Sequence, residues 1–163
     1  MQTEFIGKNS LNNIKKIISD LDAKKILLVT GKSSYNKSGS EKKLIECLGD
    51  AIIERFFDFE ANPNIKDVQV GISIISSFKP DLVIAIGGGS VIDIAKLINI
   101  FAAHVIKEKE IYEFVNKSES VNKPGLPLVA IPTTSGTGSE ATHFAVVYIG
   151  NKKYSFAHKY VLP

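Results

Sequence analysis

The chain has 163 residues, of which 44% are apolar and 23% charged, the balance of one soluble globular domain spanning residues 1–163. Its 20 basic residues are interleaved with 17 acidic ones, which argues against a nucleic-acid groove despite the net charge of +3. The longest apolar stretch, residues 82–106, contains Asp93 and Lys96, so we expect no membrane partner. With no secretory pattern at its start and only Cys47, the sequence predicts a cytoplasmic protein.

Strand and helix patterns alternate along the chain, which predicts an α/β fold with a parallel sheet covered on both faces. In chain order we expect an edge element at 5–7, a helix capped by Asn9 or Ser10 and running to 21, a strand at 25–30, and a helix through 44–48. A strand at 52–57, a turn at 62–64, a helix at 65–78, a strand at 82–86 and a helix to 103 follow. The last part comprises a polar stretch at 108–125 with some helix around 111–114, a strand at 128–131, and a hairpin of 144–149 with 153–156.

The most informative stretch reads LVIAIGGGSVIDIAK at residues 82–96, where an apolar strand ends in three glycines and a helix follows. Glycine lets the backbone approach an anion closely, and the first N–H groups of a helix point at it. Asp93 and Lys96 lie one helical turn apart, on the face just below this turn. A tight strand-to-helix turn also favours glycine, but three in a row exceed what one turn needs. The pattern therefore favours a site for nucleotide phosphates.

A second motif, PTTSGTGSEAT at residues 132–142, follows the last predicted parallel strand. Ligands of open α/β folds bind at the carboxyl edge of the sheet, where this motif lies. Its six hydroxyl side chains suit a ribose, a carboxamide or phosphate oxygens, although an ordinary polar loop has a similar composition. Ser135 has no strand–elbow–helix context and no His–Asp pair to activate it, so we exclude a serine hydrolase.

Taken together, the two motifs resemble the iron-containing alcohol dehydrogenase family, whose relatives include glycerol dehydrogenase and, more distantly, dehydroquinate synthase. The resemblance covers essentially the whole chain and implies a Rossmann-like nucleotide-binding fold. The matching residues are Asn62-Pro63, Gly87, Gly88, Gly89, Ser90, Asp93 and Lys96, then Pro132, Thr133, Thr134, Gly136, Thr137, Ser139, Glu140 and Thr142.

The resemblance also implies a role for each part of the motifs. The glycine turn would hold the dinucleotide pyrophosphate, and Asp93 would lie near the nicotinamide. Val146 and Lys153 on the hairpin would close over the nicotinamide ribose, although a solvated charge is the alternative for Lys153. The adenosine and ribose path would be lined by Thr133, Thr134, Thr137 and Thr142.

One departure from the family bears on the cofactor. Many members carry an aspartate after the first nucleotide-domain strand, where it bonds the adenosine ribose hydroxyls. This chain has Gly31 there, followed by Lys32, Ser33 and Ser34. An aspartate would repel a 2′-phosphate, whereas glycine with these neighbours would accept one, so we expect NADP(H) in preference to NAD(H).

The other departure is at the end of the sequence. The family continues into an all-helical domain that supplies the metal ligands, an aspartate and histidines, whereas this sequence ends at Pro163. His104, His143 and His158 follow no family spacing. We therefore expect no metal site and no catalytic residue in this chain, with iron or another divalent metal only in the missing C-terminal domain.

The expected function is that of the nucleotide-binding portion of a dehydrogenase that reduces a small aldehyde with NADPH. Residues 142–148 and 153–158 resemble the phosphonoacetaldehyde reductase branch of the family, which implies an anionic substrate. We also expect a homo-oligomer. The rival interpretation is a stand-alone nucleotide-binding module without catalysis.

Overall fold

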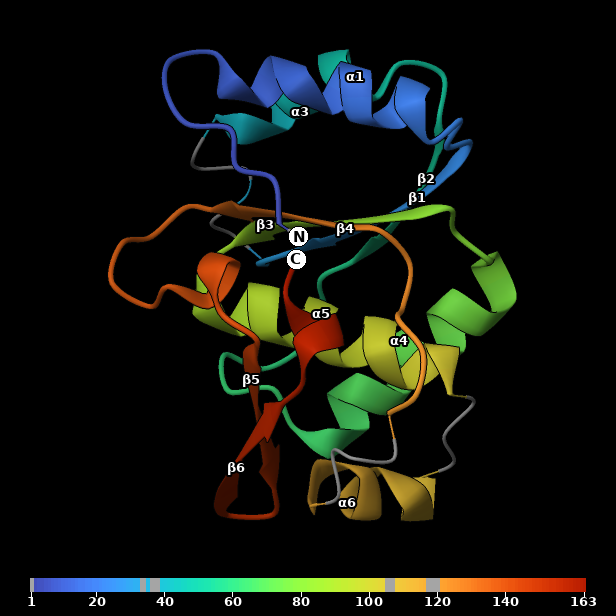
Figure 1. Ribbon diagram of the computed structural model, residues 1–163, viewed down its shortest axis with the longest axis vertical. Coiled ribbons are helices and arrows are strands. Elements are labelled where there is room, and N and C mark those ends of the chain that lie inside the picture. Colours follow the sequence, from blue (N-terminus) through green and yellow to red (C-terminus); the bar gives the residue numbers. More distant parts are fainter. Residues whose placement is uncertain (1, 33–34, 36–38, 105–107, 117–120) are drawn as a thin grey trace.

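A four-stranded parallel sheet forms the centre of the molecule in the computed structural model, which describes residues 2–32, 35, 39–104, 108–116 and 121–163 (Figure 1). The spatial order is β2-β1-β3-β4, so the first strand lies in the middle of the sheet, with the second on one side of it and the third on the other. The strands are β1 (Lys25–Thr30), β2 (Ile52–Phe56), β3 (Leu82–Gly87) and β4 (Leu128–Pro132). The predicted parallel sheet is confirmed.

Helices cover both faces of the sheet, as the sequence predicts (Figure 1). One face carries α1 (Asn13–Asp20) and α3 (Ser40–Leu48), and the other carries α4 (Ile65–Phe78) and α5 (Gly89–Ala103). Because successive side chains of a strand point to opposite faces, β1, β3 and β4 contribute to two cores. In β1, for example, Ile26 and Leu28 pack beneath α1 and α3, whereas Leu27 and Val29 belong to the core on the α5 side.

Helix α5 is the most enclosed element of the fold. Every residue from Val91 to Phe101 is buried, the pattern of a helix with no solvent face. The sheet covers one side of α5, α4 lies beside it, and the antiparallel hairpin of β5 (Phe144–Ile149) and β6 (Lys152–Ala157) covers another side (Figure 1). The predicted hairpin is confirmed, and its turn lies at Gly150 and Asn151.

Two segments differ from the prediction, and a third is longer than expected. Residues 5–7 form no strand, although the structure describes them. The first helix opens as a 3₁₀ turn (Ser10–Asn12), preceded by Asn9 in a left-handed conformation with φ of 67° and no side-chain cap. The helix expected around residues 111–114 is confirmed as α6 (Glu108–Asn116), which is longer than expected and buries the side chains of Ile111 and Val115.

The N-terminus of α4 ties the hairpin to the rest of the fold. Asn64 and Asp67 form a capping box, which satisfies the first donors of α4. The backbone carbonyl of Pro63 accepts a hydrogen bond of 2.8 Å from the N–H of Tyr148 in β5. The hairpin therefore contacts both α5 and the turn before α4. In the part of the chain that the structure describes, no helix is long and apolar enough to cross a membrane.

Candidate nucleotide-binding site

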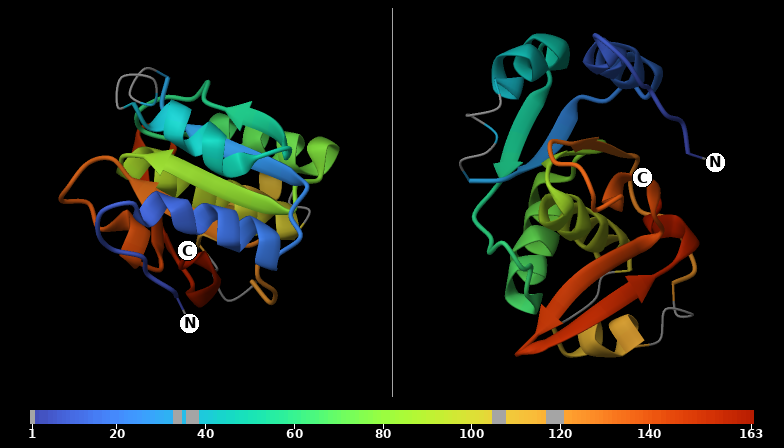
Figure 2. Two further views of the ribbon diagram at one scale, coloured as in Figure 1. Left: turned by 90° about the horizontal axis from the view of Figure 1, so that it is seen from above. Right: turned by 90° about the vertical axis from the view of Figure 1, so that its left-hand side faces the viewer.

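Three strand ends meet at the carboxyl edge of the sheet. The register sets Thr30 of β1 beside Ile86 of β3, and Gly87 beside Pro132 of β4. The residues that follow, Gly31, Gly88 and Thr133, therefore begin three neighbouring loops. The N–H of Thr133 donates to the carbonyl of Gly87 at 2.9 Å, which ties two of these loops together. The loop after β4 projects at the left of Figure 1, and the right-hand view of Figure 2 looks onto this edge.

The three glycines of the turn have different reasons to be glycine. A Cβ on Gly87 would lie 2.5 Å from Cγ2 of Val91, so Gly87 is required for packing of the strand against α5. Gly88 has an extended backbone with φ of −78°, and a Cβ there would meet only the Thr134 side chain, 3.1 Å from its hydroxyl oxygen. Neither backbone strain nor packing demands glycine at position 88. A ligand that approaches the backbone closely does supply a reason.

The N-terminus of α5 supports the same interpretation. Gly88 is its N-cap residue, and within the described residues no side chain hydrogen-bonds to this end of the helix. Gly88, Gly89 and Ser90 are half-buried and accessible. An uncapped helix start presents unsatisfied N–H groups and the positive end of the helix dipole, and both favour an anion. The turn therefore has the geometry of a phosphate cradle.

The threonine-rich loop lies directly over this turn. A Cβ built on Gly89 would lie 2.9 Å from Cγ2 of Thr137, so this loop and the glycine turn are in near contact. Thr133, Thr134 and Thr137 are exposed and offer hydroxyl groups beside the cradle. Ser139 differs from the expectation of an open hydroxyl surface, because it is buried at 8% exposure.

Lys96 holds the loop in place from below. Its side chain is 1% exposed, and its Nζ donates to the backbone carbonyls of Ser139, Thr142 and Phe144 at 2.5, 2.6 and 3.0 Å. An ammonium has three donors, so these three bonds use all of them. The ammonium of Lys96 is therefore directed at the backbone of residues 139–144 and has no donor left for a phosphate. Through these bonds Lys96 connects α5 to the segment that joins the threonine loop to β5.

Asp93 connects the same helix to the hairpin. Its Oδ2 accepts a hydrogen bond of 3.1 Å from the N–H of Val146, and the Ser139 hydroxyl also bonds it. Burial raises the pKa of Asp93, opposed by these hydrogen bonds and by the positive charges of Lys96 and Lys153. The structure thus brings Asp93, Val146 and Lys153 together. Their contact with a nicotinamide stays a prediction.

The remaining predicted residues lie in two further places. Asn62 is exposed on the turn whose next residue accepts the hydrogen bond from Tyr148, and Tyr148 pairs with Lys153 across the hairpin. Asn62 therefore lies near the hairpin, and among the described residues it makes no contact with the glycine turn. Thr142 is half-buried, and its backbone carbonyl is bound to Lys96. Ser33 and Ser34 lie outside the described residues.

Sequence reasoning missed Arg55, the only arginine of the chain. Its Nε donates to the Thr30 hydroxyl at 2.8 Å, and its Nη2 donates to the carbonyl of Gly31 at 3.3 Å. Arg55 thus lies at the strand end where the cofactor preference was predicted. The signal available in the sequence was its uniqueness among so many lysines.

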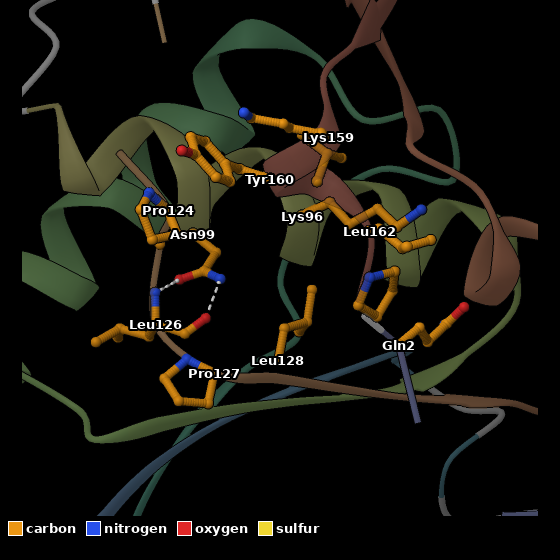
Figure 3. Close-up of a pocket in the computed structure, with 13 residues that line it drawn as sticks. Gln2, Lys96, Asn99, Pro124, Leu126, Pro127, Leu128, Lys159, Tyr160 and Leu162 are labelled. Carbon is orange, nitrogen blue, oxygen red and sulfur yellow. Dashed lines mark hydrogen bonds between the residues drawn. The ribbon is translucent and has the colours of Figure 1, made fainter. Parts of the chain in front are cut away.

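A cavity of about 390 Å³ lies elsewhere, between α5 and the chain ends (Figure 3). Of the motif residues that the sequence singled out, Lys96 alone lines it. Of its polar groups, Lys96 is fully engaged, and Asn99 exchanges two hydrogen bonds with the backbone of Leu126, at 2.8 and 2.9 Å. The backbone donors that remain open lie instead at the carboxyl edge of the sheet. The cavity is lined by Gln2, Lys96, Asn99, Leu126, Tyr160 and Leu162, among others.

The residues that the structure describes do not fit a metal ion of the family type. Among them, no three His, Cys, Asp or Glu side chains converge as ligands of one ion would. His104 bonds the carbonyl of Ile100 through Nδ1 and accepts from the N–H of Asn122 through Nε2, so both of its ring nitrogens have partners. We derive no step through a metal.

A parallel sheet with a glycine turn at its carboxyl edge and helices on both faces is a Rossmann-like nucleotide-binding fold. The chain belongs to the iron-containing alcohol dehydrogenase family, whose model matches residues 2–163.

Individual relatives agree with this assignment. Alcohol dehydrogenase 4 of Saccharomyces cerevisiae is 36% identical over 155 residues, which cover 94% of this chain and 39% of the yeast protein. The NADPH-dependent butanol dehydrogenase of Clostridium saccharobutylicum is 36% identical over 164 residues, covering 98% and 41%. Sulfoacetaldehyde reductase of Bifidobacterium kashiwanohense, solved with NAD+, superposes with a TM-score of 0.84 at 27% identity and covers 100% of this chain and 45% of its own. The chain spans about two fifths of the length of these curated relatives.

The first prediction concerns Gly88. In Gly88→Ala the added methyl group occupies the space beside the cradle, so we expect the Kd for NADPH to rise at least about tenfold while the thermal midpoint stays near that of the wild type. Calorimetric titration and thermal unfolding measure the two effects. Gly87→Ala is the matched control, and there the clash with Val91 should lower the midpoint. An unchanged Kd in Gly88→Ala would show that the turn is only structural.

The second prediction concerns Lys96. Lys96→Met leaves three buried carbonyls without their donor, and we expect a loss of about 2–4 kcal/mol in the free energy of unfolding at pH 7. Burial lowers the pKa of Lys96 from 10.5 to about 8 in the folded protein. Between these values the unfolded chain binds more protons, so the stability that Lys96 contributes rises with pH. Urea unfolding of both proteins at several pH values between 7 and 10 should show the gap widening above pH 8; a narrowing gap would contradict this.

Proposed function

We propose that residues 1–163 form the dinucleotide-binding domain of an NADP(H)-dependent dehydrogenase that transfers a hydride between the cofactor and a small aldehyde or alcohol. The observation that carries the proposal is the open backbone at Gly88 beside an uncapped helix. The fold itself leaves room for a Cβ at Gly88, but that Cβ would occupy the space that a bound phosphate needs. The bound nicotinamide would supply the hydride, and this chain would bind and orient the dinucleotide.

Each part of the edge has a task in this proposal. The N–H groups of the turn from Gly87 to Ser90 bind the pyrophosphate, which needs donors and no side chain. The exposed hydroxyls of Thr133, Thr134 and Thr137 bond to phosphate and ribose oxygens. Val146 and Lys153 of the hairpin, with Asp93 behind them, lie beside the nicotinamide ribose. Lys96 and Asp93 act on the backbone of the loop and the hairpin, and so hold these groups in position.

The preference for NADP(H) rests on Gly31. This residue lies beside the glycine turn, because β1 and β3 are neighbours in the sheet. It carries no carboxylate that would repel a 2′-phosphate or bond the 2′-hydroxyl of NAD(H). The clostridial relative is named for its use of NADPH, and the bifidobacterial reductase was solved with NAD+, so both cofactors occur among the relatives.

The third prediction tests this preference. The wild-type chain should bind NADPH at least about tenfold more tightly than NADH, the value of one charge-assisted contact. Gly31→Asp should reverse the order, because a carboxylate repels the 2′-phosphate and accepts from the 2′-hydroxyl. Calorimetric titration of both cofactors against both proteins gives the comparison. Equal affinities in the wild type would contradict the preference, and no binding of either would contradict the proposed function.

The substrate proposed is a small anionic aldehyde, with phosphonoacetaldehyde as the first to test. His143 and His158 lie opposite each other at the base of the hairpin, where the N–H of His158 donates to the carbonyl of His143 at 3.1 Å. Their imidazoles offer hydrogen-bonding groups to a phosphonate. The relative solved with NAD+ is named for sulfoacetaldehyde, another small anionic aldehyde. A cytoplasmic homo-oligomer completes the proposal.

The fourth prediction is that the 163-residue chain binds NADPH but does not reduce aldehydes alone. Three converging metal ligands are the usual minimum for a catalytic ion, and the described residues offer no such set. NADPH absorbance is followed with several small aldehydes, including phosphonoacetaldehyde, after addition of ferrous iron or zinc. We expect turnover only when a C-terminal helical domain of the family is supplied. Metal-dependent oxidation of NADPH by the chain alone would contradict the prediction.

A further inference from the structure

Arg55 reaches from the edge strand β2 to the end of β1. The register sets it beside Leu28, so it lies on the same face of the sheet as Leu28 and Thr30. Its two hydrogen bonds, to the Thr30 hydroxyl and the Gly31 carbonyl, fasten the guanidinium at the point where β1 gives way to its loop. The cation is therefore next to the residue on which the cofactor preference rests.

Two aromatic rings contact the guanidinium of Arg55 and fix its orientation. Its Cζ lies 4.7 Å from the ring centroid of Tyr35 and 4.6 Å from that of Phe57, both within the range of a cation–π contact. Tyr35 is buried at 2% exposure, which makes it a firm support. A side chain held in this way has already lost most of its conformational freedom, so a ligand that binds it incurs little further entropy loss.

The guanidinium keeps the capacity to bind an anion. The two hydrogen bonds use two of the five N–H groups of an arginine. In the described part of the chain Arg55 has no carboxylate partner, because Asp58 is paired with Lys32 at 2.9 Å. Arg55 is half-buried, so part of it remains accessible from the carboxyl edge. An accessible, unpaired and pre-oriented guanidinium is the group that proteins use for phosphate monoesters.

We infer that Arg55 is the specificity-determining residue that binds the 2′-phosphate of NADP(H). The inference rests on the proposed function. It identifies the cation that can bind the 2′-phosphate because Gly31 carries no carboxylate beside it. Lys32 is the obvious rival, but its ammonium is exposed and already bonded to Asp58. A purely structural role, in which Arg55 only fastens β1 to β2, is the alternative that the experiment has to separate.

NADPH and NADH differ only in the 2′-phosphate, so the ratio of their affinities isolates the contact. We expect Arg55→Met to raise the Kd for NADPH at least about tenfold and the Kd for NADH less than about twofold. Arg55→Lys keeps the charge but not the planar fork, and should lower the NADPH preference at least about threefold. It also serves as the test should the methionine variant fold poorly. Calorimetric titration of the whole chain at fixed salt, with thermal unfolding in parallel, gives these values.

Lys24→Met is the matched control, because it removes one positive charge at the amino end of β1, at the opposite edge of the sheet. It should leave both affinities unchanged. Equal losses for NADPH and NADH in the Arg55 variants would overturn the inference and leave a structural role. An unchanged NADPH affinity would overturn it as well. Failure of the wild type to bind either dinucleotide would instead refute the proposed function, and the inference with it.

Discussion

The candidate site depends on one buried ammonium. Lys96 is part of α5, yet its three hydrogen bonds are all to carbonyls of residues 139–144. Those residues contain few apolar side chains that could fix them by burial, so the hydrogen bonds of Lys96 hold them where packing does not. A cation among carbonyl oxygens tolerates burial far better than one among hydrocarbons. The loop over the glycine turn and the start of the hairpin are therefore held by the same helix whose N-terminus faces the proposed phosphate.

The edge of the sheet divides its work between packing and binding. Gly87 has no room for a side chain because of Val91, whereas the space at Gly88 is open apart from Thr134. Arg55 and Gly31 lie at the end of β1, and the threonine loop lies at the end of β4. Parallel strands bring these ends together because all of them point the same way. Residues that the sequence separates by as many as a hundred positions thus form one surface.

Much of this arrangement could be predicted from the sequence. Strand and helix periodicity gave the sheet, its helices and the hairpin, and the glycines with the threonine loop indicated the edge that binds. What could not be predicted depends on contacts between distant segments. Spacing showed Lys96 near Asp93, but only the tertiary structure shows that its partners are carbonyls more than forty residues away. In the sequence, Arg55 resembles any charged residue of a strand, and Ser139 any hydroxyl residue of a loop. The local pattern indicated only the middle of α6 and not its full length.

The complete enclosure of α5 has a consequence for the order in which the chain acquires its structure during synthesis. The helix ends at Ala103, but the hairpin that covers its outer side begins at Phe144, some forty residues later. At ribosomal rates of roughly 5–20 residues per second, the two are made several seconds apart. During that interval the nascent chain exposes an apolar helix flank whose cover does not yet exist. A chaperone that shields hydrophobic segments would have its natural substrate there, and arrest of translation between the two elements would leave the chain prone to aggregation.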